Sequence, residues 1–128
     1  MAAGQTGLCD LAVGDIFHAV SSNGASLVCL VTAVDDLTIS ARRIHTQDDH
    51  RFDRNTGFEW DKKHTKIDCV VPLPPEIHGL FLTMDRKYQE LTALVRKGVE
   101  LDPQQCKLTP DERRASGFMR NHVTANRI

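Results

Sequence analysis

The chain has few aromatic residues and no closely paired cysteines, and both shortages limit what it can be. Aromatic residues make up 5% of its 128 residues, with one Trp and one Tyr, so any core must be mainly aliphatic. The four cysteines, Cys9, Cys29, Cys69 and Cys106, are widely spaced and form no C-x-x-C pair. A zinc site built on cysteine pairs and a disulfide framework are therefore disfavoured. We expect free thiols, with Cys29 and Cys69 buried in apolar segments.

The chain also lacks a charge excess of either sign and a long apolar run. Its formal net charge is −1 at pH 7, which argues against a protein that holds polyphosphate by bulk charge. The longest apolar run, 27–34, is too short to cross a membrane. The N-terminal residues lack the basic start and apolar stretch of a signal peptide. We therefore predict a cytoplasmic protein with no membrane partner.

Residues 15–72 contain short apolar segments separated by turn residues. The turn signals are clearest at 21–24 and 54–57, where Asn and Gly accept a positive φ at low cost. The run at 26–34 has no alternation, which predicts a central strand buried on both faces, and alternation at 37–42 points Leu37, Ile39 and Ala41 inward. The predicted strands are 15–20, 26–34, 37–42, 51–53, 58–60 and 67–71.

The periodicity changes after the prolines at 72–75. Apolar residues then recur at spacings of three and four, which predicts a helix over 75–97 that is ended by Gly98. Thr109 and Glu112 form a capping box that opens a second helix over 110–125. We therefore predict a loose N-terminus at 1–14, a barrel at 15–72 and a helical part at 75–128, packed on the barrel as one unit.

In strand number and turn spacing, residues 15–72 resemble the small SH3-like and Tudor-like barrels. The predicted fold class is α+β: a curled β-barrel of five to six short antiparallel strands, followed by two α-helices. The resemblance covers about half of the chain and includes no signature residues. It therefore implies a fold and no particular function.

Residues 51–66 interleave aromatic side chains with basic ones, which is typical of surfaces that hold single-stranded nucleic acid. An aromatic pocket here would equally suit a peptide or a methylated lysine. The simpler interpretation, which we favour for Phe58 and Trp60, places both side chains on one strand face that looks into the barrel. The candidate binding residues are Arg51, Phe52, Arg54, Phe58, Trp60, Lys62 and Lys63.

The histidines offer an alternative site for a metal. Imidazole and carboxylate groups in the polar loops are ligands for divalent transition metals, and the candidates are His45, Asp48, His50 and His64. No pair of histidines has the i, i+4 spacing of a helical zinc motif, so exposed loop histidines are the simpler interpretation. The sequence otherwise predicts no cofactor, and no nucleophile or phosphate-loop motif indicates an enzyme.

The leading hypothesis is therefore a non-enzymatic binding or adaptor module whose barrel surface holds a protein or nucleic-acid ligand. The metal protein or metal-dependent enzyme is the first alternative. The second is a structural or assembly subunit acting through the 75–97 helix, whose apolar stripe follows a heptad spacing. A homo-oligomer of that kind would form through Ile77, Phe81, Leu82, Met84 and Tyr88.

Overall fold

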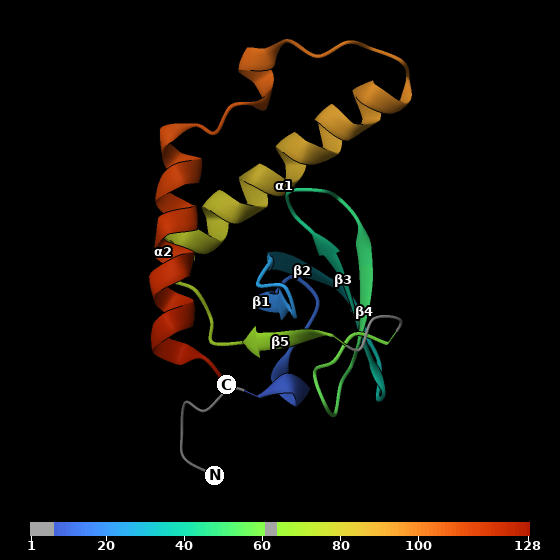
Figure 1. The fold of residues 1–128 in the computed structure, drawn as a ribbon, viewed down its shortest axis with the longest axis vertical. Coiled ribbons are helices and arrows are strands. Elements are labelled where there is room, and N and C mark those ends of the chain that lie inside the picture. The colour runs from blue at the N-terminus through green and yellow to red at the C-terminus, as the bar shows by residue number, and fades with distance from the viewer. Residues whose placement is uncertain (1–6, 61–63) are drawn as a thin grey trace.

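A computed structural model describes residues 7–60 and 64–128. In those ranges the strands come first and the helices follow, which confirms an α+β fold (Figure 1). Two 3-10 turns, at Leu8–Asp10 and Pro103–Cys106, were not predicted. The strands and helices are β1 (Ile16–Ser21), β2 (Ser26–Val34), β3 (Thr38–Arg43), β4 (Asp49–Asp53), β5 (Thr65–Cys69), α1 (Pro75–Arg96) and α2 (Pro110–Asn126).

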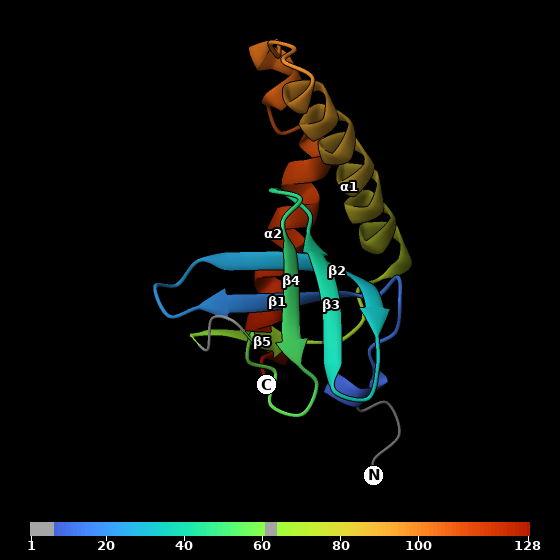
Figure 2. The same cartoon turned by 90° about the vertical axis from the view of Figure 1, so that its right-hand side faces the viewer.

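The strands form one antiparallel sheet in the order β4-β3-β2-β1-β5. Consecutive strands are neighbours from β1 to β4, and β5 returns to pair with the free side of β1. The sheet curls so that its two outer strands, β4 and β5, approach each other around the inner face (Figure 2). The result is a half-barrel.

Residues 57–60, which we call the seam, join the two edges of the sheet. Single β-bridges pair Phe52 with Glu59 and Phe58 with Lys66. The backbone N–H of Trp60 donates to the Arg51 carbonyl of β4 at 2.9 Å, and that of Glu59 donates to the Thr65 carbonyl of β5 at 2.8 Å. The strand predicted at 58–60 is therefore a short bridging segment, and it covers edges that would otherwise expose unpaired backbone groups.

The sheet separates two hydrophobic cores. One lies inside the curl and includes Phe17, Ile39 and Phe52, whereas the other lies between the outer face and the helices. Neighbouring β2 residues contribute to both, because Cys29 belongs to the first core and Leu30 to the second. The prediction that β2 is buried on both faces is therefore confirmed in the middle of the strand.

The inward orientation predicted for Leu37 is wrong. Its side chain is 63% exposed, whereas Ile39 and Ala41 are buried as expected. The reason is that β3 begins only at Thr38, and the backbone N–H of Leu37 is part of a turn in which it donates to Asp35 Oδ1 at 2.9 Å. A residue in that turn does not follow the alternation of the strand.

Helix α1 ends as predicted. Gly98 has a φ of +80°, and its N–H donates to the Val95 carbonyl while the N–H of Val99 donates to the Leu94 carbonyl. This is the Schellman arrangement, which satisfies carbonyls that the end of a helix leaves open. The first half of α1 covers the sheet and its second half extends beyond it (Figure 2). No helix in the described ranges is both long and apolar enough to cross a membrane.

Buried polar contacts attach α1 to the sheet. The Arg42 guanidinium of β3 donates two hydrogen bonds of 3.1 and 2.7 Å to the Asp85 carboxylate of α1, and the Gln47 amide donates a third of 2.9 Å. Burial of Asp85 opposes its ionisation, but these donors outweigh burial and hold its pKa below the ordinary value. The bidentate geometry therefore fixes the direction of α1 across the sheet.

Candidate functional site

The seam has an inverted pattern of burial. Its side chains alternate as in any strand, yet the two aromatic residues face outward and the acid between them faces inward. Phe58 and Trp60 are 39% and 43% exposed, whereas Glu59 is only 5% exposed. The expectation that Phe58 and Trp60 fill the barrel interior is therefore wrong. Exposing large apolar side chains while burying a carboxyl group opposes folding stability, which makes this segment a candidate for function.

The outward aromatic side chains line a cavity of about 410 Å³, which we call the seam pocket. Its wall is mostly apolar, with few polar groups, a composition typical of ligand pockets. Two of its lining residues are acidic, and the described lining contains no basic residue. The residues of the seam pocket are Asp53, Thr56, Phe58, Glu59 and Trp60.

Glu59 is held at the seam by a histidine on β4. Its Oε2 lies 2.7 Å from His50 Nδ1, and both side chains are almost fully buried. The remaining polar atoms of this pair, Glu59 Oε1 and His50 Nε2, are buried without a hydrogen-bond partner among the described residues. Buried groups of this kind carry a free-energy cost, which this pair imposes on the fold at the seam.

Contacts at both ends of the seam fix the two aromatic rings. The indole Nε1–H of Trp60 donates to Thr38 Oγ1 at 3.1 Å, which orients the ring over β3. Lys66 Nζ lies 5.2 Å from the centre of the Phe58 ring, a cation–π distance. The ammonium group of Lys66 therefore already contacts the ring of Phe58 within the protein.

The backbone of the seam is set by a turn that the sequence indicated. Asp53 Oδ1 accepts a hydrogen bond from the Asn55 N–H at 2.8 Å, and Thr56 Oγ1 accepts one from the Phe58 N–H at 3.2 Å. Both contacts are local side-chain turns of the type that Asp and Thr favour. They direct Phe58 outward as the chain leaves β4.

Other residues of the predicted binding surface have structural roles. Phe52 is 0% exposed and packs edge-on against Phe17 at 5.4 Å, so it belongs to the core and cannot contact a ligand. The Arg54 guanidinium donates to the carbonyls of Asp35 and Cys9 at 2.7 Å, which ties the N-terminal segment to the barrel. Arg51 lies exposed on β4. Two further candidates, Lys62 and Lys63, lie outside the described residues.

The four predicted metal ligands are at different places. His45 lies against Tyr88 of α1, with ring centres 5.4 Å apart, whereas His50 pairs with Glu59 at the seam. Asp48 and His64 are exposed. Across residues 7–60 and 64–128, no group of three or more His, Cys, Asp or Glu side chains is arranged to hold a metal ion.

The residues predicted to form an oligomer interface are partly used within the chain. Ile77, Phe81 and Met84 are buried in the core between the sheet and the helices, and are not accessible to a second copy. Leu82 and Tyr88 are half-buried beside that core. The hydroxyl of Tyr88 donates to Glu112, and burial followed by the nearby Glu112 charge raises its pKa to about 12.

Sequence reasoning missed the acidic members of the seam pocket. Asp53 and Glu59 are not among the predicted binding residues, because the linear sequence does not show which side chains share a cavity. The available signal was the alternation Phe58-Glu59-Trp60, which places the acid opposite the aromatic residues. Comparisons of the chain with protein-family models, curated proteins and solved structures find no significant match. Site geometry must therefore support any functional proposal.

Proposed function

We propose that the protein is a non-enzymatic binding module whose seam pocket holds a basic side chain of a partner protein. The observation that carries the proposal is the inverted burial of the seam, which exposes Phe58 and Trp60 beside buried Glu59. A module that displays its aromatic residues sacrifices the stability that their burial would supply. Recognition of a ligand is the usual compensation for such an arrangement.

The chemistry of the seam pocket favours a cation. Aromatic faces attract ammonium and guanidinium groups through their negative π-surface, and desolvation strengthens the attraction. Asp53 and Glu59 are both lining residues, so negative charge lies close to the aromatic rings, although the Glu59 carboxylate itself faces inward toward His50. The contact between Lys66 and Phe58 is an internal example of the same interaction.

The nucleic-acid alternative has less support from the seam pocket. Stacking platforms for single strands lie beside basic groups that follow the phosphates. Here two acidic residues line the described part of the pocket against one cation at an aromatic ring, Lys66 beside Phe58, and the guanidinium of Arg54 is occupied by backbone carbonyls. An acidic wall would repel a phosphate backbone, so we infer a protein ligand.

The single tryptophan provides a direct test, because Trp60 is the only source of indole fluorescence in the chain and lies in the pocket. Short peptides that carry lysine, trimethyllysine or arginine should shift its emission in a saturable way. A matched peptide with norleucine, which keeps the carbon chain of lysine without its charge, should not. Trp60→Ala and Phe58→Ala should each weaken binding by about 3- to 30-fold. Because Trp60→Ala removes the fluorescent indole, its affinity is measured by calorimetry.

Val95→Ala is the control, because Val95 is an exposed apolar residue on α1 outside the seam pocket. All three substitutions truncate exposed side chains, so circular dichroism should show an unchanged fold. Binding that is equal for the lysine and norleucine peptides would contradict cation recognition. Binding that survives loss of both aromatic side chains would contradict the seam pocket as the site.

A further inference from the structure

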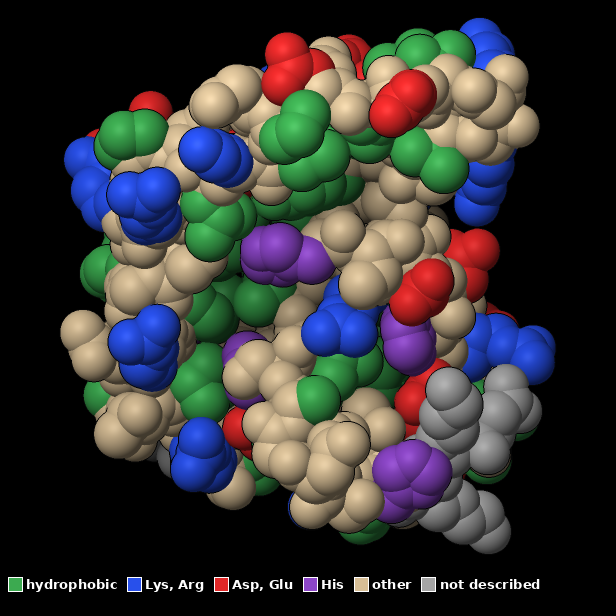
Figure 3. Space-filling view, turned by 45° about the horizontal axis from the view of Figure 1, so that its top comes forward, with side chains coloured by type: hydrophobic (Ala, Val, Ile, Leu, Met, Phe, Trp, Pro, Cys, Tyr) green, Lys and Arg blue, Asp and Glu red, His purple; other side chains and the backbone are tan. Residues whose placement is uncertain are grey.

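A second hollow lies between the sheet and α2, away from the seam. In Figure 3 its floor is hydrophobic, histidine side chains lie at its edge, and basic side chains follow the edge formed by α2. Its volume is about 210 Å³. We call it the histidine pocket, and its polar lining consists of His18, Ser26, His45, Ser116 and Arg120.

The centre of the histidine pocket is a histidine oriented by a buried carboxylate. His18 Nδ1 lies 2.6 Å from Asp68 Oδ1, and each side chain is 7% exposed. With Nδ1 committed to the carboxylate, the ring presents Nε2, which has no hydrogen-bond partner among the described residues. A carboxylate that fixes the ring and tautomer of a histidine in this way is a frequent feature of binding and catalytic sites.

A β-bulge lies at this pair. His18 of β1 is opposite Cys69 of β5, but the next residue, Ala19, is opposite Ile67. Two residues of β5, Asp68 and Cys69, are therefore opposite the single residue His18, which is the arrangement of a β-bulge. Ile67 faces the inner core, so strand alternation turns Asp68 to the opposite face, on which His18 lies, and the two side chains meet there.

The remaining polar groups around the pocket can all donate hydrogen bonds. The guanidinium of Arg120 and the hydroxyls of Ser26 and Ser116 have no side-chain partner within the described ranges. His45 lies beside Tyr88, and burial together with the Arg43 charge lowers its pKa. A neutral His45 still presents one ring N–H as a donor.

The charges near the pocket favour an anion. Arg120 lines the pocket, and Arg43 lies near it, because it donates to the carbonyl of the lining residue Ser26 at 3.0 Å and its charge acts on His45. The negative charge of Asp68 is balanced by Arg127, whose Nε lies 3.3 Å from its Oδ2. Glu112 acts on His45 from α2 but is itself paired with Lys87 at 2.6 Å. Two positive charges are left without a counter-charge in the described structure.

We propose that the histidine pocket binds a phosphate group. Guanidinium, imidazole and hydroxyl donors surround it from both the sheet and α2, which suits the several acceptor oxygens of a tetrahedral anion. His18 Nε2 fits the same ligand in either protonation state, because it donates to a dianion when protonated and accepts from the P–OH of a monoanion when neutral. This site is independent of the seam pocket and of its function.

Inorganic phosphate is the first probe, with the ring Cε1–H signals of the six histidines as the readout. Phosphate should shift the His18 and His45 signals in a saturable way, with assignments from His18→Gln and His45→Gln. Arg120→Gln should weaken binding by about tenfold, because it removes a charged donor to the anion. Arg86→Gln removes the same charge from an exposed position on α1 outside the pocket, and should leave the affinity unchanged.

A phosphoserine peptide and its unphosphorylated form distinguish the source of the phosphate. If the phosphopeptide binds more tightly than inorganic phosphate, the natural ligand is a phosphorylated partner protein. If inorganic phosphate binds more tightly, the natural ligand is a small phosphate compound. Both results support the site. Unshifted His18 and His45 signals would overturn the proposed site by showing that phosphate does not bind there. Equal weakening by Arg120→Gln and Arg86→Gln would overturn it by showing that only bulk charge attracts the anion. Because Arg120 is exposed, Arg120→Gln should fold normally, and a loss of affinity can then be assigned to the missing guanidinium.

Discussion

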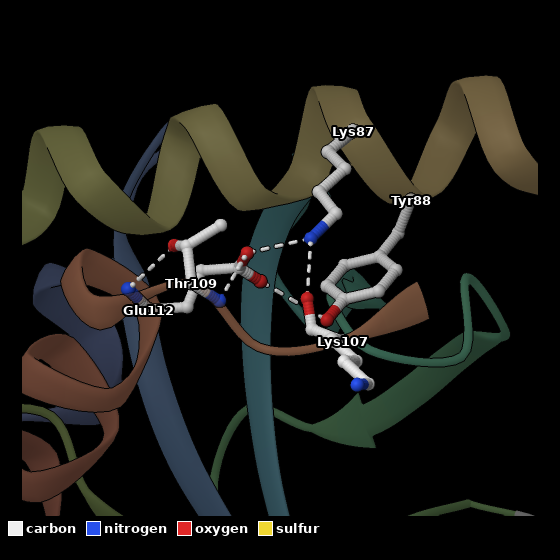
Figure 4. Close-up of polar contacts among 5 residues, drawn as sticks. All are labelled: Lys87, Tyr88, Lys107, Thr109 and Glu112. Atoms are coloured by element: carbon white, nitrogen blue, oxygen red, sulfur yellow. Dashed lines mark hydrogen bonds and ion pairs between the residues drawn. The ribbon is translucent and has the colours of Figure 1, made fainter. Parts of the chain in front are cut away.

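Lys87 of α1 and Glu112 of α2 form a 2.6 Å ion pair that joins the two helices (Figure 4). Glu112 also accepts a hydrogen bond from the Tyr88 hydroxyl at 3.1 Å, and it completes the capping box of α2 with Thr109. Burial opposes the ionisation of Glu112, but the hydrogen bonds from Lys87, Thr109 and Tyr88 outweigh it, so its pKa lies below the ordinary value. One carboxylate therefore begins α2 and orients it against α1.

The first prediction concerns the charge of this carboxylate. Glu112→Gln keeps the shape of the side chain and the capping pattern but removes the ion pair with Lys87. We expect the free energy of unfolding to fall by about 2 kcal/mol, because hydrogen bonds to charged groups are stronger than neutral ones. Urea unfolding followed by circular dichroism measures the change.

A second ion pair between the same helices provides the control. Glu76 of α1 and Arg114 of α2 are 2.9 Å apart, but both side chains are more than half exposed. Glu76→Gln should therefore cost about 0.5 kcal/mol or less, since exposed pairs contribute little. Equal losses in the two variants would show that burial does not distinguish these ion pairs.

The second prediction is a loss of stability in acid. Asp85 and Glu112 both have a folded-state pKa below the ordinary values of 3.8 and 4.5. Their ionised forms therefore stabilise the fold fully above those values, and the stabilisation disappears as the pH falls through the lower, folded-state pKa values. Urea unfolding between about pH 6 and about pH 2 should show this decline.

Substitution identifies the source of the acid sensitivity. Asp85→Asn and Glu112→Gln should be less stable than the unmodified chain near neutral pH, and the difference should shrink in acid. The reason is that protonation removes the same charge interactions from the unmodified chain. A difference that stays constant with pH would show that these two carboxylates do not carry the acid transition.

The sequence predicted the elements that depend on local patterns. The alternation at β3 beyond Leu37, the capping box at Thr109 and the stop at Gly98 are each decided within a few residues, and all three occur in the structure. The boundaries of both helices agree to within one residue. The likeness to SH3-like or Tudor-like barrels stays a prediction, because strand number and turn spacing do not determine how a sheet closes.

The candidate sites depended on contacts that the sequence does not show. The pair His18–Asp68 joins residues fifty positions apart and depends on the pairing of β1 with β5, which no local pattern indicates. At the seam, the expectation that apolar residues face inward fails, because Glu59 faces inward and pairs with His50 of β4. The error at the seam therefore occurs where a buried polar pair outweighs the hydrophobic pattern.

The third prediction concerns the turn that directs the seam. Gly57 has a φ of +81°, and an added Cβ would lie 3.3 Å from Leu8 Cδ1 and 3.6 Å from Ile67 Cβ. Gly24 has a similar φ of +85° with no atom within 4 Å of such a Cβ. Both substitutions to Ala should cost about 1–2 kcal/mol from the backbone alone, and Gly57→Ala should cost about 1 kcal/mol more from crowding.

Thermal unfolding compares the two glycine variants, and Trp60 emission reports on the seam. Gly57→Ala should shift the emission, because its crowded turn leads directly into the aromatic segment, whereas Gly24→Ala should not. Equal stability losses with unchanged emission in both variants would show that the turn at Gly57 tolerates the added methyl group.

The fourth prediction uses the cysteines to follow the two cores. Cys9 and Cys106 are exposed, whereas Cys29 lies in the barrel core and Cys69 in the core under the helices. Burial raises the pKa of Cys29 to about 12 and also raises that of Cys69, so neither presents a thiolate at neutral pH. Ellman's reagent should therefore modify two thiols quickly and two only after unfolding.

A variant with Cys9→Ser and Cys106→Ser leaves only the two protected thiols. If the chain unfolds in one cooperative step, Cys29 and Cys69 should react with the same dependence on urea. Earlier exposure of Cys69 would instead show that the helices separate from the sheet before the barrel opens. Because Asp85 and Arg42 hold α1 on β3 through two hydrogen bonds, we expect a single step. Asp85→Asn should then expose Cys69 first.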